Sequence, residues 1–390
     1  MDNIKEIDQT YVAGTYARFP VEIVRGKGSL VYDETGKEYI DLGSGIGVTA
    51  FGVADGEWIE AVTKQLGTLQ HMSNLYYTEP CALLARELCQ RTGMKKVFFG
   101  NSGAEANECA VKVARKYAAQ KKGAEYSTVL TLRNSFHGRT LTMLSATGQD
   151  HFHSLYQPLT PGFVHAEADN LPEVERLVQE NRVAGILIEC VQGEGGVRPL
   201  SKNFIRSLAD IAAREDILLM IDEVQTGNGR TGELYSYMHF DIVPDVVSTA
   251  KGLGGGLPLG ACLIGEKAKD VLAPGDHGST FGGNPVACAG ALNVLGRIDG
   301  ALLSRVREKS HMVFEMLGGA PGIEAVSGLG LMIGIKPEKL TAAQAANACL
   351  EKGVLCTTAK DRLRLLPALN IPAEQLEKAV SIIKEVCASS

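Results

Sequence analysis

The chain has 390 residues, of which 45% are hydrophobic and 22% are charged. It is therefore long enough for two domains and too apolar for intrinsic disorder. Its formal net charge of -6 argues against non-specific binding of nucleic acid, because such binding needs clustered lysine and arginine.

Cysteine usage and the start of the chain point to a reducing compartment. The nine cysteines occur singly, with no CxxC pair and no histidine at zinc-ligand spacing, so we expect neither a metal site nor a disulfide framework. The first residues, MDNIKEIDQTYVAG, carry charges where a signal peptide would be apolar, and no apolar stretch is long enough to cross a bilayer. We therefore expect a cytoplasmic protein.

In chain order, the first predicted element is a β-hairpin over residues 24–41, where an alternating pattern flanks the turn DETG. From about residue 55 to 275, short apolar runs alternate with segments of helical period. The runs are residues 96–99, 127–132, 185–189, 217–221, 245–248 and 261–265, and the clearest helical segments are 104–120 and 201–215. This alternation predicts a largely parallel sheet covered by helices on both faces.

The last part of the chain, from about residue 285, returns to helices mixed with short strands. It ends in a helix that starts at Pro372 and carries an apolar stripe made of Leu376, Ala379, Val380, Ile383 and Val386. The overall prediction is an α/β fold. Residues 55–284 form a large domain in it, and residues 1–54 and 285–390 together form a smaller α+β domain.

Three of the predicted strands end in polar or glycine-rich segments. The run ILLMI is followed by Asp222, DVVSTA is followed by Lys251 and GLGGG, and KKVFFG is followed by NSGAEANE. Each segment alone is compatible with an ordinary turn or helix cap. The ends of parallel strands meet at one edge of a sheet, however, so the three segments should lie together.

Together these segments supply what pyridoxal 5'-phosphate (pyridoxal phosphate) needs from a protein. Backbone N–H groups at Ser102, Gly103 and Ala104, before a helix, suit the dianionic phosphate. A carboxylate at Asp222 suits the protonated pyridine nitrogen, and Lys251 in a loop of small residues suits the aldehyde. The sequence therefore predicts a pyridoxal phosphate site.

Rival motifs fit less well. ILLMIDE has the form of an ATPase metal-binding strand, but the chain contains no GxxxxGK followed by serine or threonine. GNGRTG at 227–232 matches GxGxxG, yet it begins six residues after the last apolar residue of the strand and no clear amphipathic helix follows it. A hydrolase is unsupported because GxSxG is absent.

Several longer strings resemble those of the class III pyridoxal-phosphate-dependent aminotransferases. They are NSGAEANE, FHGRT at 136–140, QGEGG at 192–196, DEVQTGNGRTG at 222–232, AKGLGGGLPLG at 250–260 and TFGGNP at 280–285. With RGKGSLVYDETGKEYIDL and LRLLPALN, the resemblance covers nearly the whole chain in family order. It implies the type I pyridoxal-phosphate transferase fold and a homodimer whose active sites lie at the subunit interface.

The resemblance also implies cofactor-binding roles. Lys251 matches the lysine that binds the cofactor covalently and Asp222 the partner of the pyridine nitrogen, while Gln225 approaches the phenolic oxygen. Phe136 matches the aromatic residue stacked on the ring. Gly103 and Ala104 match the phosphate-binding turn, which also includes Ser102, and Thr280 matches a hydroxyl that reaches the phosphate from the partner subunit.

On the substrate side, Arg139 matches the arginine that binds the carboxylate distant from the reacting amine, and Tyr16 lies where relatives add a phenol. Glu194 and Arg364 match a pair that switches between substrates: Arg364 binds the α-carboxylate of glutamate, and Glu194 covers it when an ω-amine is bound. Ile46 stands where ornithine aminotransferases carry a tyrosine, which favours an acylated nitrogen over a free ammonium.

The implied reaction transfers the terminal amine of N-acetylornithine to 2-oxoglutarate, a step of arginine biosynthesis. Ornithine, succinylornithine, succinyldiaminopimelate and 4-aminobutyrate are alternative donors, and an aminomutase-type isomerase is an alternative enzyme class. The chain departs from the family at FGVADGEW, residues 51–58, where relatives have GH.HP, and at Cys190, where proline commonly follows Glu189. We expect these departures to affect the loop at the cleft mouth and the substrate more than the reaction class.

Overall fold

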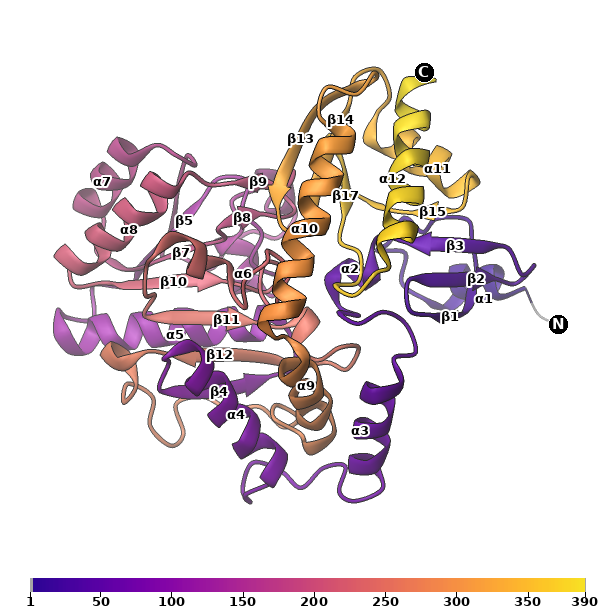
Figure 1. The fold of residues 1–390 in the computed structure, drawn as a ribbon. Helices are drawn as coiled ribbons and strands as arrows, with labels where there is room; N and C mark the ends of the chain where they lie inside the picture. The colour runs from indigo at the N-terminus through magenta and orange to yellow at the C-terminus, as the bar shows by residue number, and fades with distance from the viewer. Residues whose placement is uncertain (1–2, 390) are drawn as a thin grey trace.

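A seven-stranded sheet forms the centre of the molecule, in a computed structural model that describes residues 3–389 (Figure 1). Its strands, in spatial order, are β4 (Lys96–Gly100), β12 (Gly260–Ile264), β11 (Val246–Thr249), β10 (Leu218–Asp222), β7 (Val183–Ile188), β5 (Thr128–Leu132) and β6 (Phe163–Ala166). Only β12 runs antiparallel to its neighbours, so the predicted largely parallel α/β sheet is confirmed. The sequence pattern revealed neither the direction of β12 nor the presence of β6.

Helices cover both faces of this sheet, because each central strand is apolar on both sides. α5 (Gly103–Lys121) covers one face, and α7 (Leu171–Glu180) and α8 (Lys202–Arg214) cover the other (Figure 1). Successive residues of β10 illustrate the alternation: Met220 packs in the cluster that contains α5, and Ile221 packs in the cluster that contains α8. The sheet is thus rigidly buried, and its strand ends are fixed in space.

The two ends of the chain meet in a separate sheet. β1 (Ile23–Lys27), β2 (Leu30–Asp33) and β3 (Glu38–Asp41) form an antiparallel meander, and β3 pairs in parallel with β15 (Val354–Leu355). The predicted hairpin is confirmed in β2 and β3, and Asp33 closes its turn by accepting a hydrogen bond from the Thr35 amide at 2.9 Å. The domain boundaries at residues 54 and 284 stay a prediction.

A second antiparallel sheet holds the C-terminal part of the chain. It consists of β13 (Ile323–Leu329), β14 (Met332–Pro337), β17 (Arg362–Leu365) and β16 (Thr357–Ala359), with α10 (Gly300–Leu317), α11 (Ala342–Glu351) and α12 (Ala373–Ala388) packed nearby. α12 begins directly after Pro372, and the whole predicted apolar stripe is buried. Figure 1 shows these elements beside the N-terminal strands.

The remaining elements connect these layers. They are α1 (Ile4–Tyr11), α2 (Ser44–Gly47), α3 (Gly56–Leu66), α4 (Glu79–Thr92), α6 (Leu141–Ala146), α9 (Pro285–Arg297), β8 (Val191–Gln192), β9 (Arg198–Pro199) and four 3₁₀ turns, η1 (Asp150–Phe152), η2 (Ser236–Phe240), η3 (Lys251–Leu253) and η4 (Glu266–Ala268). Within residues 3–389, no single helix is long and apolar enough to cross a membrane. The pair α9 and α10 passes that test only jointly, with a 73° bend between the two helices.

The segment GNGRTG, considered above as a dinucleotide motif, has a structural role. The buried guanidinium of Arg230 donates to the carbonyls of Leu331 at 3.1 Å and Pro367 at 2.5 Å, and so joins the large sheet to the C-terminal part. Asn228, with a left-handed φ of 57°, donates from Nδ2 to the Ala250 carbonyl at 3.1 Å. That second bond fixes the backbone immediately before Lys251.

Candidate active site

A cavity of about 460 Å³ opens where β4, β10 and β11 end. Its lining includes eight residues expected from the sequence: Ser102, Gly103, Ala104, Phe136, Arg139, Asp222, Gln225 and Lys251. Asn107, His137, Glu189 and Val224 also line it and were not expected. The structure thus brings together the three strand ends that the sequence singled out.

The first turn of α5 forms one wall of the cavity. Ser102 caps the helix by accepting a hydrogen bond from the Glu105 amide at 3.2 Å. Gly103 is close-packed, because a Cβ there would lie 2.6 Å from Cγ1 of Val224. The absence of a side chain lets the helix N-terminus, with its free N–H groups and positive dipole end, approach the cavity, which suits a phosphate.

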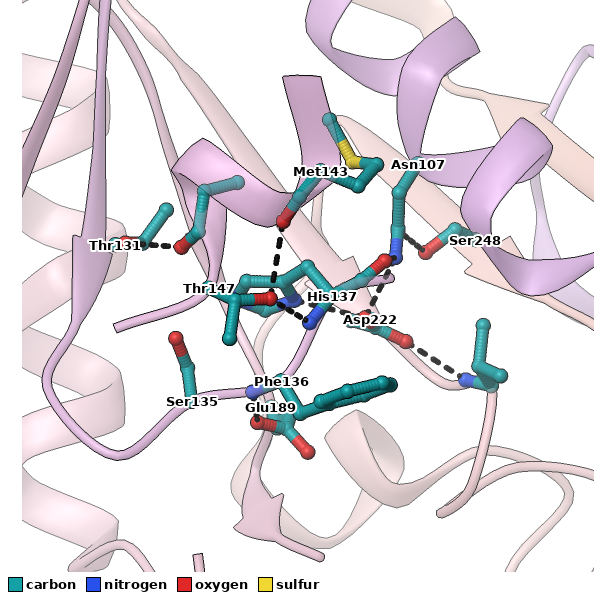
Figure 2. A network of polar contacts seen from close by, with 12 residues as sticks. Asn107, Thr131, Ser135, Phe136, His137, Met143, Thr147, Glu189, Asp222 and Ser248 are labelled. Carbon is teal, nitrogen blue, oxygen red and sulfur yellow. Dashed lines mark hydrogen bonds and ion pairs between the residues drawn. The ribbon is translucent and has the colours of Figure 1, made fainter. Parts of the chain in front are cut away.

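Asp222, at the end of β10, is buried and its carboxylate is fully hydrogen-bonded (Figure 2). Oδ2 accepts from Asn107 Nδ2 at 2.7 Å and lies 2.8 Å from His137 Nδ1, and Oδ1 accepts from the Val224 amide at 3.0 Å. Ser248 donates to Asn107 Oδ1 at 2.5 Å, which orients the amide so that Nδ2 faces Asp222. These contacts fix the orientation of the Asp222 carboxylate at the strand end.

His137 is held with one ring nitrogen on Asp222 and the other without a partner. Its backbone amide donates to Thr147 Oγ1 at 3.0 Å, and Thr147 in turn donates to the Met143 carbonyl at 2.9 Å (Figure 2). Nε2 is buried and has no hydrogen-bond partner among residues 3–389. The ring therefore meets Asp222 through Nδ1, and this contact fixes the orientation of the imidazole.

Lys251 follows β11 in a strained backbone conformation, with φ at +43°. This left-handed region is unfavourable for a residue with a side chain and is common at active sites. Burial lowers the pKa of the Lys251 amine, and the nearby carboxylates of Asp222 and Glu194 offset only part of that effect. A lowered pKa increases the fraction of uncharged, nucleophilic amine near neutral pH.

Glu189 links two loops of the cavity. Its Oε2 accepts from the Phe136 amide at 3.0 Å and its Oε1 accepts from the Gly193 amide at 3.1 Å. Burial raises the pKa of Glu189 to about 7, although both of these bonds favour the charged form. Glu189 therefore fixes the backbone at Phe136, an aromatic residue of the cavity wall, and the backbone at Gly193, directly before Glu194.

Glu194 and Arg364 form an ion pair in which Oε1 and Nη1 are 2.5 Å apart. The Arg364 side chain is 3% exposed, whereas that of Glu194 is 31% exposed, so Glu194 is the partner with room to move. Arg364 also donates from Nη1 to Gln225 Oε1 at 3.2 Å and from Nε to Thr357 Oγ1 at 3.3 Å. Loss of the glutamate would leave the guanidinium oriented but without a countercharge.

The other expected substrate residues are dispersed. Arg139 lies at the cavity with its guanidinium 4.0 Å from the centre of the Phe152 ring, and it forms no ion pair within residues 3–389. Tyr16 and Ile46 are 74% and 40% exposed and do not line the cavity. Thr280 is exposed in a neighbouring hollow beside residues 71–74. A single chain therefore does not bring these three into contact with Lys251.

The donor set of the cavity fits pyridoxal phosphate. It combines a helix N-terminus, a hydrogen-bonded carboxylate at Asp222, an amine of lowered pKa at Lys251 and an aromatic wall at Phe136. Asn107 was missed because it lies in a helical segment whose apolar pattern indicated packing, and His137 and Glu189 were missed because their contacts join segments far apart in the sequence. The available signal for Asn107 was an amide in the apolar run AEANECAVKVA, where a polar side chain needs a partner.

Residues 11–387 match the model of the family described as aminotransferase class-III. The acetylornithine aminotransferase of Haemophilus ducreyi is 48% identical, covering 99% of this chain and 98% of the relative, and that of Aquifex aeolicus is 47% identical, covering 97% and 100%. Two solved structures also superpose closely. The ornithine aminotransferase of Toxoplasma gondii has a TM-score of 0.95 at 30% identity, covering 99% of this chain and 94% of that one. The N-acetylornithine aminotransferase of Stenotrophomonas maltophilia has a TM-score of 0.85 at 32% identity, covering 98% of each.

The lowered pKa of Lys251 predicts how cofactor capture depends on pH. Only the uncharged amine can attack an aldehyde, so the capture rate of pyridoxal phosphate by the apo-protein should rise with pH. It should level off below about pH 10, where an exposed lysine loses its proton. Rapid-mixing absorbance at a series of pH values measures the rate, with Lys251→Ala as the control that lacks this phase. A rate that keeps rising through about pH 10 contradicts the prediction.

Proposed function

This chain belongs to the class III aminotransferases, and we propose that it transfers the terminal amino group of N-acetylornithine to 2-oxoglutarate. The products are N-acetylglutamate 5-semialdehyde and glutamate, as in a step of arginine biosynthesis. The relatives named acetylornithine aminotransferase support the choice of donor. Within the chain, the observation that carries the proposal is the ion pair of Glu194 with Arg364 beside the Lys251 cavity.

Class III aminotransferases depend on pyridoxal phosphate, which, when bound, supplies an electron-withdrawing ring that stabilises negative charge on the substrate carbon. In the proposed arrangement the first turn of α5, at Gly103 and Ala104, holds the phosphate. Asp222 holds a proton on the ring nitrogen, and Asn107 and His137 keep that carboxylate in place. Phe136 covers the ring and Gln225 approaches its phenolic oxygen.

Lys251 has two proposed tasks. Its amine would bind the cofactor in the resting enzyme. Once the substrate amine has displaced it, the freed Lys251 would take the proton from the substrate carbon that bears the amine and deliver it to C4′ of the cofactor. Both tasks need an uncharged amine, and the burial that lowers the pKa of Lys251 supplies it. The carboxylates nearby keep that amine from losing all of its basicity.

Two arginines divide the substrate carboxylates. Arg139, whose guanidinium lies at the cavity over the Phe152 ring, binds the carboxylate distant from the reacting amine. Glutamate also has an α-carboxylate beside its amine, and Arg364 binds that group after Glu194 moves aside. N-acetylornithine has only CH₂ there, so Glu194 stays on Arg364 and spares the site an unpaired buried charge.

We further propose a homodimer with shared active sites. The segment around Leu75, Tyr76 and Tyr77 exposes 87%, 62% and 106% of these side chains, and Phe281 exposes 61%. Asn74 donates to the carbonyls of Ser279 and Gly282 at 2.9 Å and so joins the two segments into one surface. A second copy of the chain would cover this apolar surface and receive Thr280 at its own cofactor phosphate.

The donor is tested by presenting amino compounds one at a time. Purified protein loaded with pyridoxal phosphate is mixed with N-acetylornithine, and the single-turnover loss of the bound cofactor's absorbance is followed. We expect kcat/KM for N-acetylornithine to exceed that for ornithine by about tenfold or more, because this chain has Ile46 where ornithine aminotransferases carry a tyrosine beside the free ammonium. Faster reaction with ornithine, succinylornithine or 4-aminobutyrate overturns the choice of donor, and turnover without 2-oxoglutarate indicates the isomerase.

The role of the ion pair is tested with Glu194→Ala. Arg364 would then always be free for an α-carboxylate, so glutamate should react as well as before or better. N-acetylornithine should lose about ten- to hundredfold in kcat/KM relative to glutamate, because its CH₂ would face a bare guanidinium. The single-turnover rate is measured with each donor separately. An equal fall for both donors would show that Glu194 is structural.

Mixing two variants, each inactive or weakened alone, tests whether Thr280 binds the cofactor phosphate in the active site of the partner subunit. Lys251→Ala and Thr280→Val are each expected to bind or use the cofactor poorly on their own. A hybrid dimer should regain one intact site, formed by Lys251 of one chain and Thr280 of the other. Activity at low cofactor concentration should therefore rise severalfold after the two are mixed and re-associated. If mass spectrometry confirms that hybrid dimers have formed and activity still does not recover, Thr280 does not contribute to the partner's active site.

A further inference from the structure

The only tryptophan of the chain, Trp58, lies in the segment FGVADGEW that departs from the family pattern. It is in the first turn of α3, where Asp55 caps the helix by accepting a hydrogen bond from the Trp58 amide at 3.0 Å. The indole is half-buried, and its Nε1 donates to the Gly254 carbonyl at 3.2 Å. Gly254 belongs to the glycine loop that follows Lys251.

Glycines on two sides make room for this indole. A Cβ on Gly255 would lie 2.7 Å from Nε1 of Trp58, and a Cβ on Gly290 of α9 would lie 2.8 Å from the same atom. A Cβ on Gly256 would lie 3.6 Å from Cη2. The indole therefore fits between α9 and the glycine loop. A side chain at Gly255 or Gly290 would displace it.

Within the loop itself, the Leu257 amide donates to the Gly254 carbonyl at 3.3 Å, and the indole adds a second donor to that same carbonyl from outside the loop. Gly255 and Gly256 have φ values of +63° and +137°, and fixing glycine in one conformation loses more backbone entropy than fixing any other residue. The Gly254 amide donates to the Lys251 carbonyl at 3.1 Å, so one chain of hydrogen bonds leads from the indole to the strained backbone of Lys251. Gly256 separates the main cavity from a second cavity of about 180 Å³ that Trp58 lines.

Trp58 is itself firmly held. Arg297, at the end of α9, binds both carboxylate oxygens of Asp55, at 2.5 Å and 3.0 Å. The same guanidinium lies 3.8 Å from the centre of the Phe51 ring. This side chain thus fixes the start of α3 relative to α9, and the indole is presented to the glycine loop from a rigid support.

We propose that Trp58 is a positioning residue for Lys251, which acts by holding residues 254–256 in place from the side opposite the main cavity. The inference rests on the proposed role of Lys251 but goes beyond it, because it assigns a task to a residue that does not touch the cavity. The competing explanation is that Trp58 only packs α3 against α9. The two differ in whether loss of the indole loosens the loop.

The test compares Trp58→Phe with Val62→Ala. Val62 is on the same helix and its Cγ2 lies 3.1 Å from the Cβ position of Gly290, so it contributes to the packing of α3 on α9. The first readout is hydrogen exchange of residues 250–259 in the apo-protein, where Trp58→Phe should exchange about three- to tenfold faster and Val62→Ala should match the parent. In the loaded enzyme, Trp58→Phe should lower kcat about three- to tenfold with KM for the donor within about twofold.

Equal exchange of the loop in both variants overturns the proposal, as does a loss of activity that appears in KM alone. If Trp58→Phe does not fold, Gly290→Ala displaces the indole from the α9 side and should loosen the same loop. An unchanged loop in that variant also overturns the proposal. The exchange measurement needs no substrate, so a wrong assignment of the donor leaves this test intact.

Discussion

A buried carboxylate at the end of β10 is the constraint around which the site is arranged. Burial of an ionised carboxylate is unfavourable by several kcal/mol unless donors replace the lost water. Asp222 finds its donors in three different segments: Asn107 on α5, His137 on the loop after β5, and the amide of Val224 in its own turn. Each of these segments must therefore sit at a fixed distance from the strand end.

The next residue along the chain, Glu223, also has a buried carboxylate, but its role differs from that of Asp222. Glu223 is fully buried on the other side of the strand end, and its carboxylate accepts from Thr226 Oγ1 at 2.6 Å, Ser236 Oγ at 2.7 Å and the Tyr237 amide at 2.9 Å. Burial raises the pKa of Glu223. Glu223 thus anchors the 222–237 segment, while Asp222 faces the cavity. Strand alternation separates the two roles.

The sequence predicted those features that depend on local pattern. Apolar runs located the central strands, and the polar ends of three of them located the cavity lined by Asp222, Lys251 and Ser102. Strand direction is not a local property, and so the antiparallel β12 was missed. His137 and Glu189 were missed because their contacts join segments about fifty or more residues apart, which hydrophobic period cannot reveal.

Thr280 and Tyr16 were expected at the active site, but they do not line the cavity of the single chain. Thr280 and Tyr16 are exposed in the single chain, and their predicted roles came from the family resemblance and not from spacing. Nothing in the pattern of one chain encodes which residues a second copy would receive. The apolar side chains exposed near Thr280 are the surface that the proposed second copy would cover.

Strained backbone links the lysine to the segment that carries Ile46. Residues 44–47 have four successive left-handed φ values, between 47° and 74°, and for a β-branched residue such as Ile46 this conformation is disfavoured. Such strain persists only where packing enforces it. The Gly47 carbonyl lies 3.3 Å from the Cβ position of Gly252, on the turn that begins at Lys251, so the two strained segments brace each other. A side chain at Gly252 would press on the Gly47 carbonyl, so the backbone that presents the amine and the backbone that presents Ile46 pack directly against each other.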